Sequence, residues 1–402
     1  MSRLNPPKYV LQILERLTRR GFEAYMVGGC VRDMLLGRRP LDWDICTSAL
    51  PEEVAAVFPR SRPTGIRHGT VTVRMHGAHA EVTTFRSDGT YTDHRRPDCV
   101  RFVSALKDDL ARRDFTVNAL AMPRSGEVID LFGGKRDLEN KRLCCVGAPN
   151  KRFEEDALRM LRAFRFAAVL GFEIEPHTLH AIKNNARLTA GLAKERIRAE
   201  LERVLLSPAP ETISDMAAAG VLDALIKDRV VFADLSALRQ LPHKSLLRWA
   251  GLCALLENSG VIDDTADFLT ALRLDTSTIR SCTTGCKLAK TDIPADAIAW
   301  KRLLAANGTD AAHCAAAALD VLFVRGHLRQ LKAVLRSGDC YSLSRLAVTG
   351  EDLKQLGFVG PALGKSLAAL LDHVIVCPAD NDRASLLRLA AAFSNPESPG
   401  PR

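Results

Sequence analysis

The stretch GGCVRDMLLGRRPLDWDICT, residues 28–47, joins a glycine pair to two aspartates that lie two positions apart. The glycines follow the apolar run 24–27, which predicts a strand, and they precede a helical pattern. Backbone N–H groups at such a turn can bind phosphate oxygens, and Arg32, one turn into the helix, can add a charge-assisted contact. The pattern therefore predicts a phosphate-binding turn at Gly28 and Gly29.

The two aspartates, Asp42 and Asp44, are expected in a second strand. Side chains two apart in a strand point to the same face, so these carboxylates repel one another unless a cation lies between them. Carboxylate oxygens suit Mg²⁺, which binds through one or two carboxylates together with substrate phosphates. Glu81, in a later alternating run, is a candidate for a third acid on an adjacent strand. A polar strand end is the alternative interpretation of the aspartate pair alone.

Composition indicates a folded protein with more than one domain. The chain has 402 residues, of which 47% are hydrophobic and 26% charged, and its formal net charge is +9. The positive charge favours a polyanionic partner, most simply nucleic acid. The sequence shows neither a signal peptide nor an apolar run of membrane length, so a cytoplasmic location is expected. The 11 cysteines lack zinc-finger spacing and are expected to be reduced structural thiols.

The hydrophobic pattern changes near residue 147. Short β-rich runs separated by turns precede this point, which predicts an α+β domain with a mixed sheet. Amphipathic helical patterns rich in Leu, Ala and Arg follow it, so the remainder is expected to be all-helical. Breaks at 207–212 and 337–342 suggest boundaries within the helical part.

The chain resembles the polymerase-β-type nucleotidyltransferases in its glycine turn and its D-x-D pair. Further motifs, in the same order as in the family, narrow the resemblance to the class II tRNA nucleotidyltransferases and poly(A) polymerases. These motifs are RRDFTVNALAM (112–122), DLFGGKRDL (130–138), RFEEDALRMLRAFRFAAVLGF (152–172) and KERIRAEL (194–201). The resemblance implies a catalytic head at 1–147, a helical neck at 148–210, a body at 211–320 and a tail at 321–402.

The same resemblance assigns roles to the acidic residues and the glycine turn. It implies that Asp42 and Asp44 hold Mg²⁺ ions, and that Glu81 helps to activate the 3′-hydroxyl of an RNA primer. Gly29 and Arg32 would contact the nucleoside triphosphate. The motif RRDFTVN would bind phosphate and ribose through Arg113, Asp114 and Asn118, because a 2′-hydroxyl needs both a donor and an acceptor.

A second group of candidates lies in the motif at 152–172. Asp156, Arg159, Arg162 and Arg165 recur every three residues, which places them along one face of a predicted helix. A carboxylate and a guanidinium can together match the Watson–Crick edge of cytosine or adenine. Spacing alone is equally met by a surface salt bridge. The resemblance implies that Asp156 and Arg159 read the incoming base and that the two later arginines bind the nucleotide.

The resemblance leaves several activities open. The segment 86–102 is rich in charge, Gly and Pro and predicts a mobile loop, which CCA-adding and A-adding members of the family keep and CC-adding members shorten. Full CCA addition, A-only addition and poly(A) synthesis all remain possible activities. Outside enzymes, an RNA-binding protein with an inactive head is the alternative. The intact carboxylates Asp42, Asp44 and Glu81 argue against it.

RNA contacts are expected in the helical half of the chain. Arg325, Arg329, Lys332 and Arg336 have spacings of four, three and four, which predicts a basic stripe that follows an RNA backbone or a solvated helix face. The resemblance implies that the glycine-containing tail around 350–364 holds the tRNA elbow. The expected partners are the tRNA 3′ end and elbow, CTP and ATP, with no membrane and no DNA partner.

Overall fold

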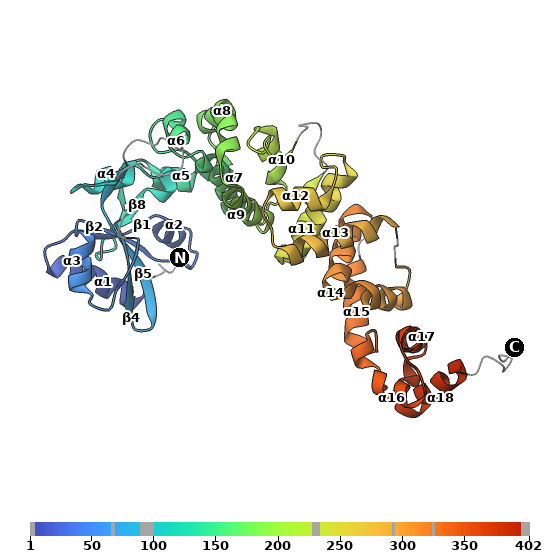
Figure 1. Cartoon of the computed structure of the whole chain (residues 1–402). Coiled ribbons are helices and arrows are strands. Elements are labelled where there is room, and N and C mark those ends of the chain that lie inside the picture. Colours follow the sequence, from blue (N-terminus) through green and yellow to red (C-terminus); the bar gives the residue numbers. More distant parts are fainter. Residues whose placement is uncertain are drawn as a thin grey trace. The chain divides into compact units, whose positions relative to one another are not determined.

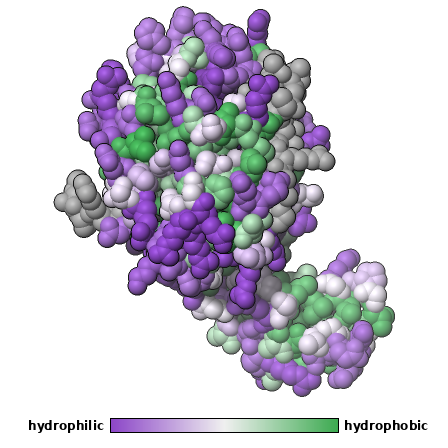
Figure 2. Space-filling view, turned by 90° about the vertical axis from the view of Figure 1, so that its left-hand side faces the viewer, coloured by the Kyte–Doolittle hydropathy of each residue, from purple (hydrophilic) through white to green (hydrophobic). Residues whose placement is uncertain are grey.

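The chain folds into two compact units, Met1–Arg229 and Val230–Arg402, each with a core of its own (Figure 1). The structure is a computed structural model, and it describes residues 5–65, 69–88, 100–226, 234–291, 294–323 and 326–394. No helix in these ranges is long and apolar enough to cross a membrane. Polar side chains cover most of the face seen in Figure 2, with smaller apolar areas between them.

A mixed seven-stranded sheet in the order β3-β4-β5-β2-β1-β8-β9 organises the first unit. β2 and β5 run parallel, whereas the other neighbouring strands run antiparallel. The α+β fold with a mixed sheet, predicted from the sequence, is confirmed. The strands are β1 (Ala24–Val27), β2 (Asp44–Thr47), β3 (Arg62–Gly65), β4 (Thr70–Met75), β5 (Ala78–Thr84), β8 (Leu120–Met122) and β9 (Ile129–Asp130).

Short helices pack against this sheet. The first of them, α1 (Lys8–Arg19), buries Val10, Ile13, Leu14 and Leu17, whose spacing of three and four puts them on one face of the helix. Another core cluster includes Val27 of β1, Phe85 after β5 and Leu110. The remaining helices of this part are α2 (Gly29–Leu35), α3 (Pro51–Val57), α4 (Leu106–Ala111) and α5 (Gly134–Glu139).

Two glycines allow close approaches beside the sheet. Gly28 has φ 75° and caps α2, a conformation that favours glycine, and a Cβ there would lie 3.0 Å from Nη1 of Arg113. Gly134 begins α5 directly against the backbone of Thr116, where a Cβ would lie only 2.2 Å from the Thr116 carbonyl oxygen. Gly28 and Gly134 therefore allow the start of α2 and the start of α5 to pack closely against the segment that precedes β8.

The helical part of the first unit follows the sheet. Its strand β11 (Glu173–Ile174), in a region that was expected to be purely helical, pairs in parallel with β10 (Arg142–Leu143) of the predicted head. In the β-rich part before it, a 3₁₀ helix, Thr116–Asn118, directly precedes β8. The helices are α6 (Pro149–Glu155), α7 (Leu158–Leu170), α8 (Pro176–Asn185), α9 (Lys194–Leu205) and α10 (Thr212–Ala218).

The predicted mobile loop at 86–102 lies partly outside the described residues. Its two ends, β6 (Arg86–Asp88) and β7 (Val100–Phe102), pair as antiparallel strands. Residues 89–99, which form the centre of the predicted loop, are outside the described ranges.

The second unit is all-helical in its described part, as predicted. Trp249 of α11 and Trp300 of α14 are buried in it. α14 contains Gly308, whose φ of 81° interrupts the helix, and the predicted body–tail boundary at residue 320 falls inside this helix. The helices are α11 (Ser245–Asn258), α12 (Thr265–Ala271), α13 (Thr276–Thr291), α14 (Ala297–Leu322), α15 (His327–Ser337), α16 (Gly350–Gln355), α17 (Pro361–Val376) and α18 (Arg383–Ser394).

The predicted basic stripe lies mainly on α15. Arg329, Lys332 and Arg336 are exposed on this helix, while Leu331 and Val334 are buried. Arg325, the fourth member of the stripe, lies outside the described residues. The described part of the stripe is therefore available to a charged partner.

Candidate active site

The structure brings the three predicted carboxylates together. Asp44 begins β2, and its Cα pairs with that of Glu81 on the parallel strand β5. Asp42 precedes the strand in which it was expected, because β2 begins only at Asp44. Asp42, Asp44 and Glu81 nevertheless line one cavity of about 430 Å³.

Electrostatics make this cavity a site for cations. Burial raises the pKa of Asp44, Arg113 lowers it, and the charges of Glu81 and Asp42 raise it again, with a net upward shift. Protein atoms surround the Asp44 carboxylate on most sides, while part of it remains exposed to solvent. A divalent cation would relieve the repulsion between these acids, and their hard oxygen donors fit Mg²⁺.

Arg113 links the carboxylates to the glycine turn. Its Nη2 donates to Oδ2 of Asp109 at 3.2 Å, and its charge acts on Asp44. The guanidinium lies against Gly28, as the short Cβ distance at that glycine shows. The Nε of Arg113 is buried and has no hydrogen-bond partner within the part of the chain that the structure describes. An anion at the glycine turn could accept this N–H.

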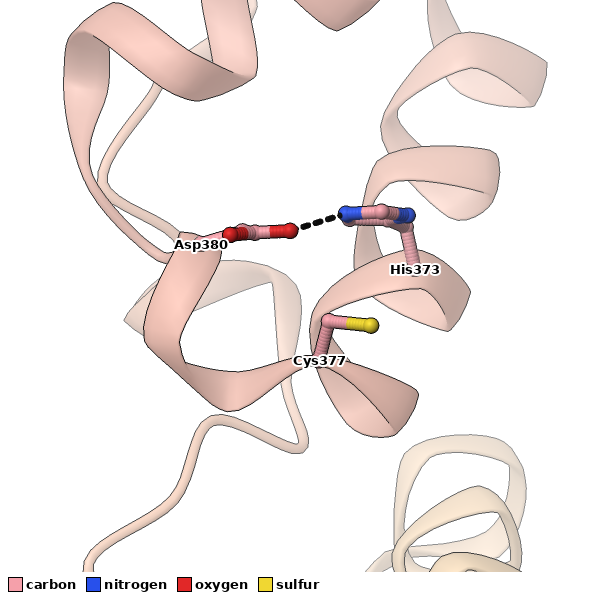
Figure 3. A group of neighbouring side chains, drawn as sticks. All are labelled: His373, Cys377 and Asp380. Atoms are coloured by element: carbon pink, nitrogen blue, oxygen red, sulfur yellow. Dashed lines mark hydrogen bonds and ion pairs between the residues drawn. The ribbon is translucent and has the colours of Figure 1, made fainter. Parts of the chain in front are cut away.

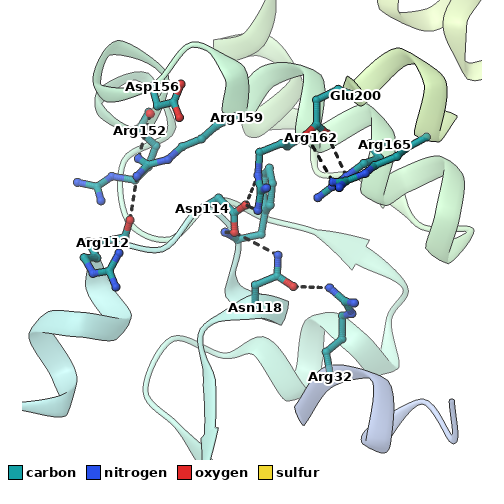
Figure 4. Close-up of polar contacts among 12 residues, drawn as sticks. Arg32, Arg112, Asp114, Asn118, Arg152, Asp156, Arg159, Arg162, Arg165 and Glu200 are labelled. Carbon is teal, nitrogen blue, oxygen red and sulfur yellow. Dashed lines mark hydrogen bonds and ion pairs between the residues drawn. The ribbon is translucent and has the colours of Figure 1, made fainter. Parts of the chain in front are cut away.

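A chain of polar side chains runs from α2 to α7 (Figure 4). Arg32 donates to Oδ1 of Asn118 at 2.5 Å, and Asn118 Nδ2 donates to Oδ1 of Asp114 at 3.1 Å. Asp114 in turn accepts from Nε of Arg162 at 2.8 Å through its other oxygen. Four of the predicted nucleotide-binding residues thus form one connected network.

Asp114 is the negative centre of this network. Burial opposes ionisation, but the charge of Arg162 and the hydrogen bond from Asn118 outweigh it and hold the pKa of Asp114 at about 2. The carboxylate is only 8% exposed. It is therefore ionised at neutral pH and acts only as a hydrogen-bond acceptor.

Phe166 gathers three predicted nucleotide-binding arginines around one ring. The guanidinium carbons of Arg32, Arg162 and Arg165 lie 5.2, 5.3 and 4.1 Å from its centroid. Arg165 also forms an ion pair with Glu200 of α9, with its Nε 3.1 Å from the carboxylate. Burial lowers the pKa of Arg165 to about 10, and the nearby positive charge of Arg162 acts in the same direction.

Asp156 does not lie on the helix face that the spacing predicts. α6 ends at Glu155, and Asp156 has an extended backbone before α7 begins, so only Arg159, Arg162 and Arg165 share the face of α7. The Asp156 carboxylate explains the break, because its Oδ1 accepts from the backbone N–H of Leu158 at 3.0 Å. Its Oδ2 accepts from Arg196 at 3.0 Å.

Arg159 is held by acceptors of the protein itself. Its Nη1 donates to Glu155 at 2.6 Å and to the carbonyl oxygen of Arg152 at 3.1 Å, and its Nη2 donates to the carbonyl oxygen of Arg112 at 2.9 Å. Asp156 and Arg159 lie at the same end of α7, as Figure 4 shows. Both predicted base-reading side chains are thus engaged within the folded chain.

Three consecutive residues touch all parts of the site. The Arg112 carbonyl accepts from Arg159, Arg113 acts on Asp44, and Asp114 accepts from Arg162. The segment 112–114 therefore connects the predicted base-reading residues to the carboxylate cavity.

Several residues of the site were missed in the sequence analysis. Tyr9 and His79 line the carboxylate cavity, and burial together with the charge of Asp42 raises the pKa of Tyr9. Asp109 fixes Arg113, and Phe166 orders the arginines. Of these residues, only Asp109 could have been recognised from the sequence, because it lies three and four positions before two arginines. Tyr9 and Phe166 lie in ordinary amphipathic helical patterns, which do not distinguish them from core residues.

Comparison with known proteins identifies the family of the chain. Residues 24–144 match the family model described as the poly(A) polymerase head domain, and residues 171–229 match a probable RNA-binding site of polymerase A. The CCA-adding enzyme of Levilactobacillus brevis is 39% identical, over 93% of this chain and 95% of its own. That of Geobacillus kaustophilus is 38% identical, over 94% and 96%.

Solved structures extend the similarity to the fold of the whole chain. The CCA-adding enzyme of Bacillus stearothermophilus, determined in complex with CTP, has a TM-score of 0.80 and 32% identity, over 97% of this chain and 98% of its own. The Thermotoga maritima CCA-adding enzyme, determined with tRNA, has a TM-score of 0.69 at 21% identity over 98% and 97% of the two chains, which shows the shared fold.

The fold and the site define a nucleotidyltransferase with a poly(A) polymerase type of head. Near-full-length identity of 38–39% makes the assignment narrower. The chain belongs to the family of class II CCA-adding enzymes, and its activity is that of a tRNA nucleotidyltransferase.

Proposed function

We propose that the chain builds or repairs the 3′-terminal CCA of tRNA from CTP and ATP and releases pyrophosphate, with Asp42, Asp44 and Glu81 at the reaction centre. One observation carries this assignment: Asp44 pairs with Glu81 across parallel strands, beside the glycine turn and Arg113. The carboxylates, the phosphate-binding turn and a buried arginine are the groups that phosphoryl transfer requires.

Asp42 and Asp44 would hold Mg²⁺, in keeping with a family that typically uses divalent metal ions. Bound there, Mg²⁺ would stabilise the charge that develops on the transferred phosphoryl group. Glu81 would orient the 3′-hydroxyl of the tRNA and accept its proton. The pKa of Asp44 is raised chiefly by burial, and the charges of Glu81 and Asp42 add to this shift, which a cation bound there would oppose.

The triphosphate would lie at the glycine turn. Gly29 offers its backbone N–H at the start of α2, whereas the Gly28 N–H already donates to the Leu120 carbonyl at 3.0 Å, and Arg113 lies against the turn through Nη1. Arg32 would exchange one of its contacts with Asp33 and Asn118 for a phosphate oxygen. Ionised Asp114, with Asn118 beside it, supplies the acceptor and the donor for the ribose 2′-hydroxyl.

Base selection would require an exchange of partners at the start of α7. Asp156 must release Arg196 or Leu158 N–H to accept from the exocyclic amine of cytosine or adenine. Arg159 must release Glu155 or a carbonyl oxygen to donate to the base. The correct base replaces these bonds one for one, whereas UTP and GTP would leave a buried polar group unpaired, which costs about 1–3 kcal/mol.

The domain division of the chain and its cellular location are also part of the proposal. The four-part division into head 1–147, neck 148–210, body 211–320 and tail 321–402 remains part of it, with tRNA bound by the helical parts. The ten described cysteines are all unpaired thiols, which supports a reducing compartment such as the cytoplasm.

Stepwise addition tests the function. The full chain is incubated with tRNA transcripts that lack CCA, end in C or end in CC, with CTP and ATP supplied separately and together. We expect all three transcripts to be extended to CCA, and Asp44→Asn to extend none. Extension of the CC-ending transcript alone would make the chain an A-adding enzyme, and untemplated poly(A) synthesis would make it a poly(A) polymerase.

A further inference from the structure

The second unit carries a cluster of three metal-binding side chains, His373, Cys377 and Asp380 (Figure 3). One ligand atom of each, a ring nitrogen, the thiol sulfur and a carboxylate oxygen, all lie within 4.8 Å of one another. We propose that this cluster binds a transition-metal dication of the Zn²⁺ type. The site is separate from the carboxylates of the first unit and goes beyond the proposed nucleotidyl transfer.

The end of α17 creates the cluster. His373 lies in its last turn, and Cys377 follows the helix directly, with its backbone N–H donating to the His373 carbonyl at 2.8 Å. Side chains four apart on a helix lie one above the other. A 3₁₀ helix, Pro378–Asp380, then turns the chain back, and the Asp380 N–H donates to the Cys377 carbonyl at 3.1 Å. This turn brings the Asp380 carboxylate to 2.7 Å from Nε2 of His373.

Packing beneath the cluster holds it in place. α17 itself contributes four side chains to the core of the second unit: Leu370, Leu371, Val374 and Ile375. The chain just after Asp380 is fixed by Asn381, which donates to the Arg345 carbonyl at 3.1 Å and accepts from the Ala347 N–H at 2.9 Å. These anchors fix the backbone that carries the ligands, so binding an ion would require side-chain adjustments only, with the ligand atoms closing in from their present separation of up to 4.8 Å.

The donor set selects the kind of ion. Imidazole nitrogen, thiolate sulfur and carboxylate oxygen are the ligands of Zn²⁺, and three protein ligands leave a fourth position for water. A thiolate and a carboxylate together balance the charge of a dication. Mg²⁺ and Ca²⁺ prefer oxygen ligands only, so the cluster differs in kind from the carboxylate cavity of the head.

The ligands can be reached from solvent. The side chains of His373 and Asp380 are 33% and 45% exposed, and Cys377 is exposed. Binding would replace the hydrogen bond between His373 and Asp380 by a bond from each to the ion, and the Cys377 thiol would lose its proton to solvent as its sulfur coordinates. Affinity should therefore rise with pH.

Cobalt spectroscopy tests the site. Co²⁺ takes the place of Zn²⁺ and gives a near-ultraviolet charge-transfer band only when a thiolate is bound. Titration of the reduced full chain should produce this band at one equivalent, and Zn²⁺ should remove it. Absence of the band in the unmodified chain would overturn the proposal. Mg²⁺ carboxylate sites cannot produce it, so the test does not depend on the nucleotidyltransferase site.

Matched variants locate the ligands. Cys377→Ser should abolish the band, and His373→Gln should weaken Co²⁺ binding at least tenfold. The control is Cys144→Ser, which removes another solvent-accessible thiol and should leave the titration unchanged. If the band persisted in Cys377→Ser, Cys377 would not be a ligand and the proposed site would be wrong. Zn²⁺ should also raise the melting temperature of the unmodified chain and not that of Cys377→Ser, which confirms that the variant folds and has lost only the ion.

Discussion

At the scale of single residues, the site depends on a few groups whose bonds fix their charge and direction. Asp114 illustrates this, because two partners on different elements, Arg162 and Asn118, keep it ionised despite burial. A carboxylate in that state must accept hydrogen bonds and cannot donate them. The sequence showed that Asp114 belongs to a motif, but its partners lie up to 48 residues away and are set by the fold.

Asp114 should give the protein a stability term that depends on pH. The folded-state pKa of about 2 lies below the ordinary value of 3.8, so the stabilisation is complete above about pH 4 and is lost as the pH falls towards 2. Its size is on the order of 2 kcal/mol. Urea denaturation between pH 6 and pH 2.5 measures the free energy of unfolding of the unmodified chain and of Asp114→Asn. The difference between these two free energies should become smaller as the pH falls. A difference that stays constant with pH would contradict the assignment. The control is Asp263→Asn, a change at an exposed residue, which should not change the free energy of unfolding at any of these pH values.

Arg159 should control which nucleotide is added. Arg159→Ala removes the guanidinium donors, so discrimination of CTP and ATP against UTP and GTP should fall by about 10- to 100-fold, the range expected for one bidentate base contact. The measurement is kcat/KM for each nucleotide with a tRNA transcript that ends in CC or lacks CCA. Exposed Arg142→Ala serves as the control and should leave the ratios intact. Unchanged selectivity in Arg159→Ala would refute the base-reading role.

At the scale of elements, the sequence predicted the types of element well and their ends poorly. The strands of the sheet have alternating apolar residues and were foreseeable, as was the helix α7 from its periodicity. The break at Asp156 was not, because it arises from a side-chain bond to Leu158 and from Arg196 on α9. Asp42 likewise falls outside β2, which begins only at Asp44.

Gly134 should be essential for the junction between α5 and the 3₁₀ helix before β8. A methyl group there would lie 2.2 Å from the Thr116 carbonyl oxygen, so the backbone would have to move. Gly134→Ala should lower the free energy of unfolding by about 1–3 kcal/mol, as overpacking does. Urea denaturation measures this loss. Gly191→Ala, where a Cβ meets nothing within 4 Å, should be nearly neutral, and equal effects of the two changes would disprove the contact.

At the scale of the whole molecule, charge is the property that the sequence predicted most directly. The net charge of +9 favours a polyanion, and the family to which the chain belongs acts on tRNA. Part of that charge lies on the exposed face of α15. What the sequence could not give was the state of the other arginines, since those around Phe166 are committed to contacts inside the protein.

The basic face of α15 should contribute to tRNA affinity and not to chemistry. Changing Arg329, Lys332 and Arg336 to Gln should raise the KM for tRNA with little effect on kcat. The slope of log affinity against log salt concentration should become shallower, because up to about three fewer counterions are released on binding. Filter binding across a salt series measures the slope. Three exposed residues of the first unit that lie outside the matched RNA-binding region, Arg16, Arg20 and Arg60, changed to Gln, remove the same total charge. An equal loss in that control would show that only net charge matters.

The segment Arg112–Asp114 sets a short, fixed spacing between three interactions of the candidate site. The carbonyl of Arg112 accepts from Arg159, which is predicted to read the base, the charge of Arg113 acts on Asp44, and Asp114 accepts from Arg162. Neighbouring Cα atoms are about 3.8 Å apart, so the spacing of the three positions cannot stretch. The insertion of a single residue here would therefore displace at least one of the contacts to Arg159 and Arg162, and with it the relative placement of the two groups.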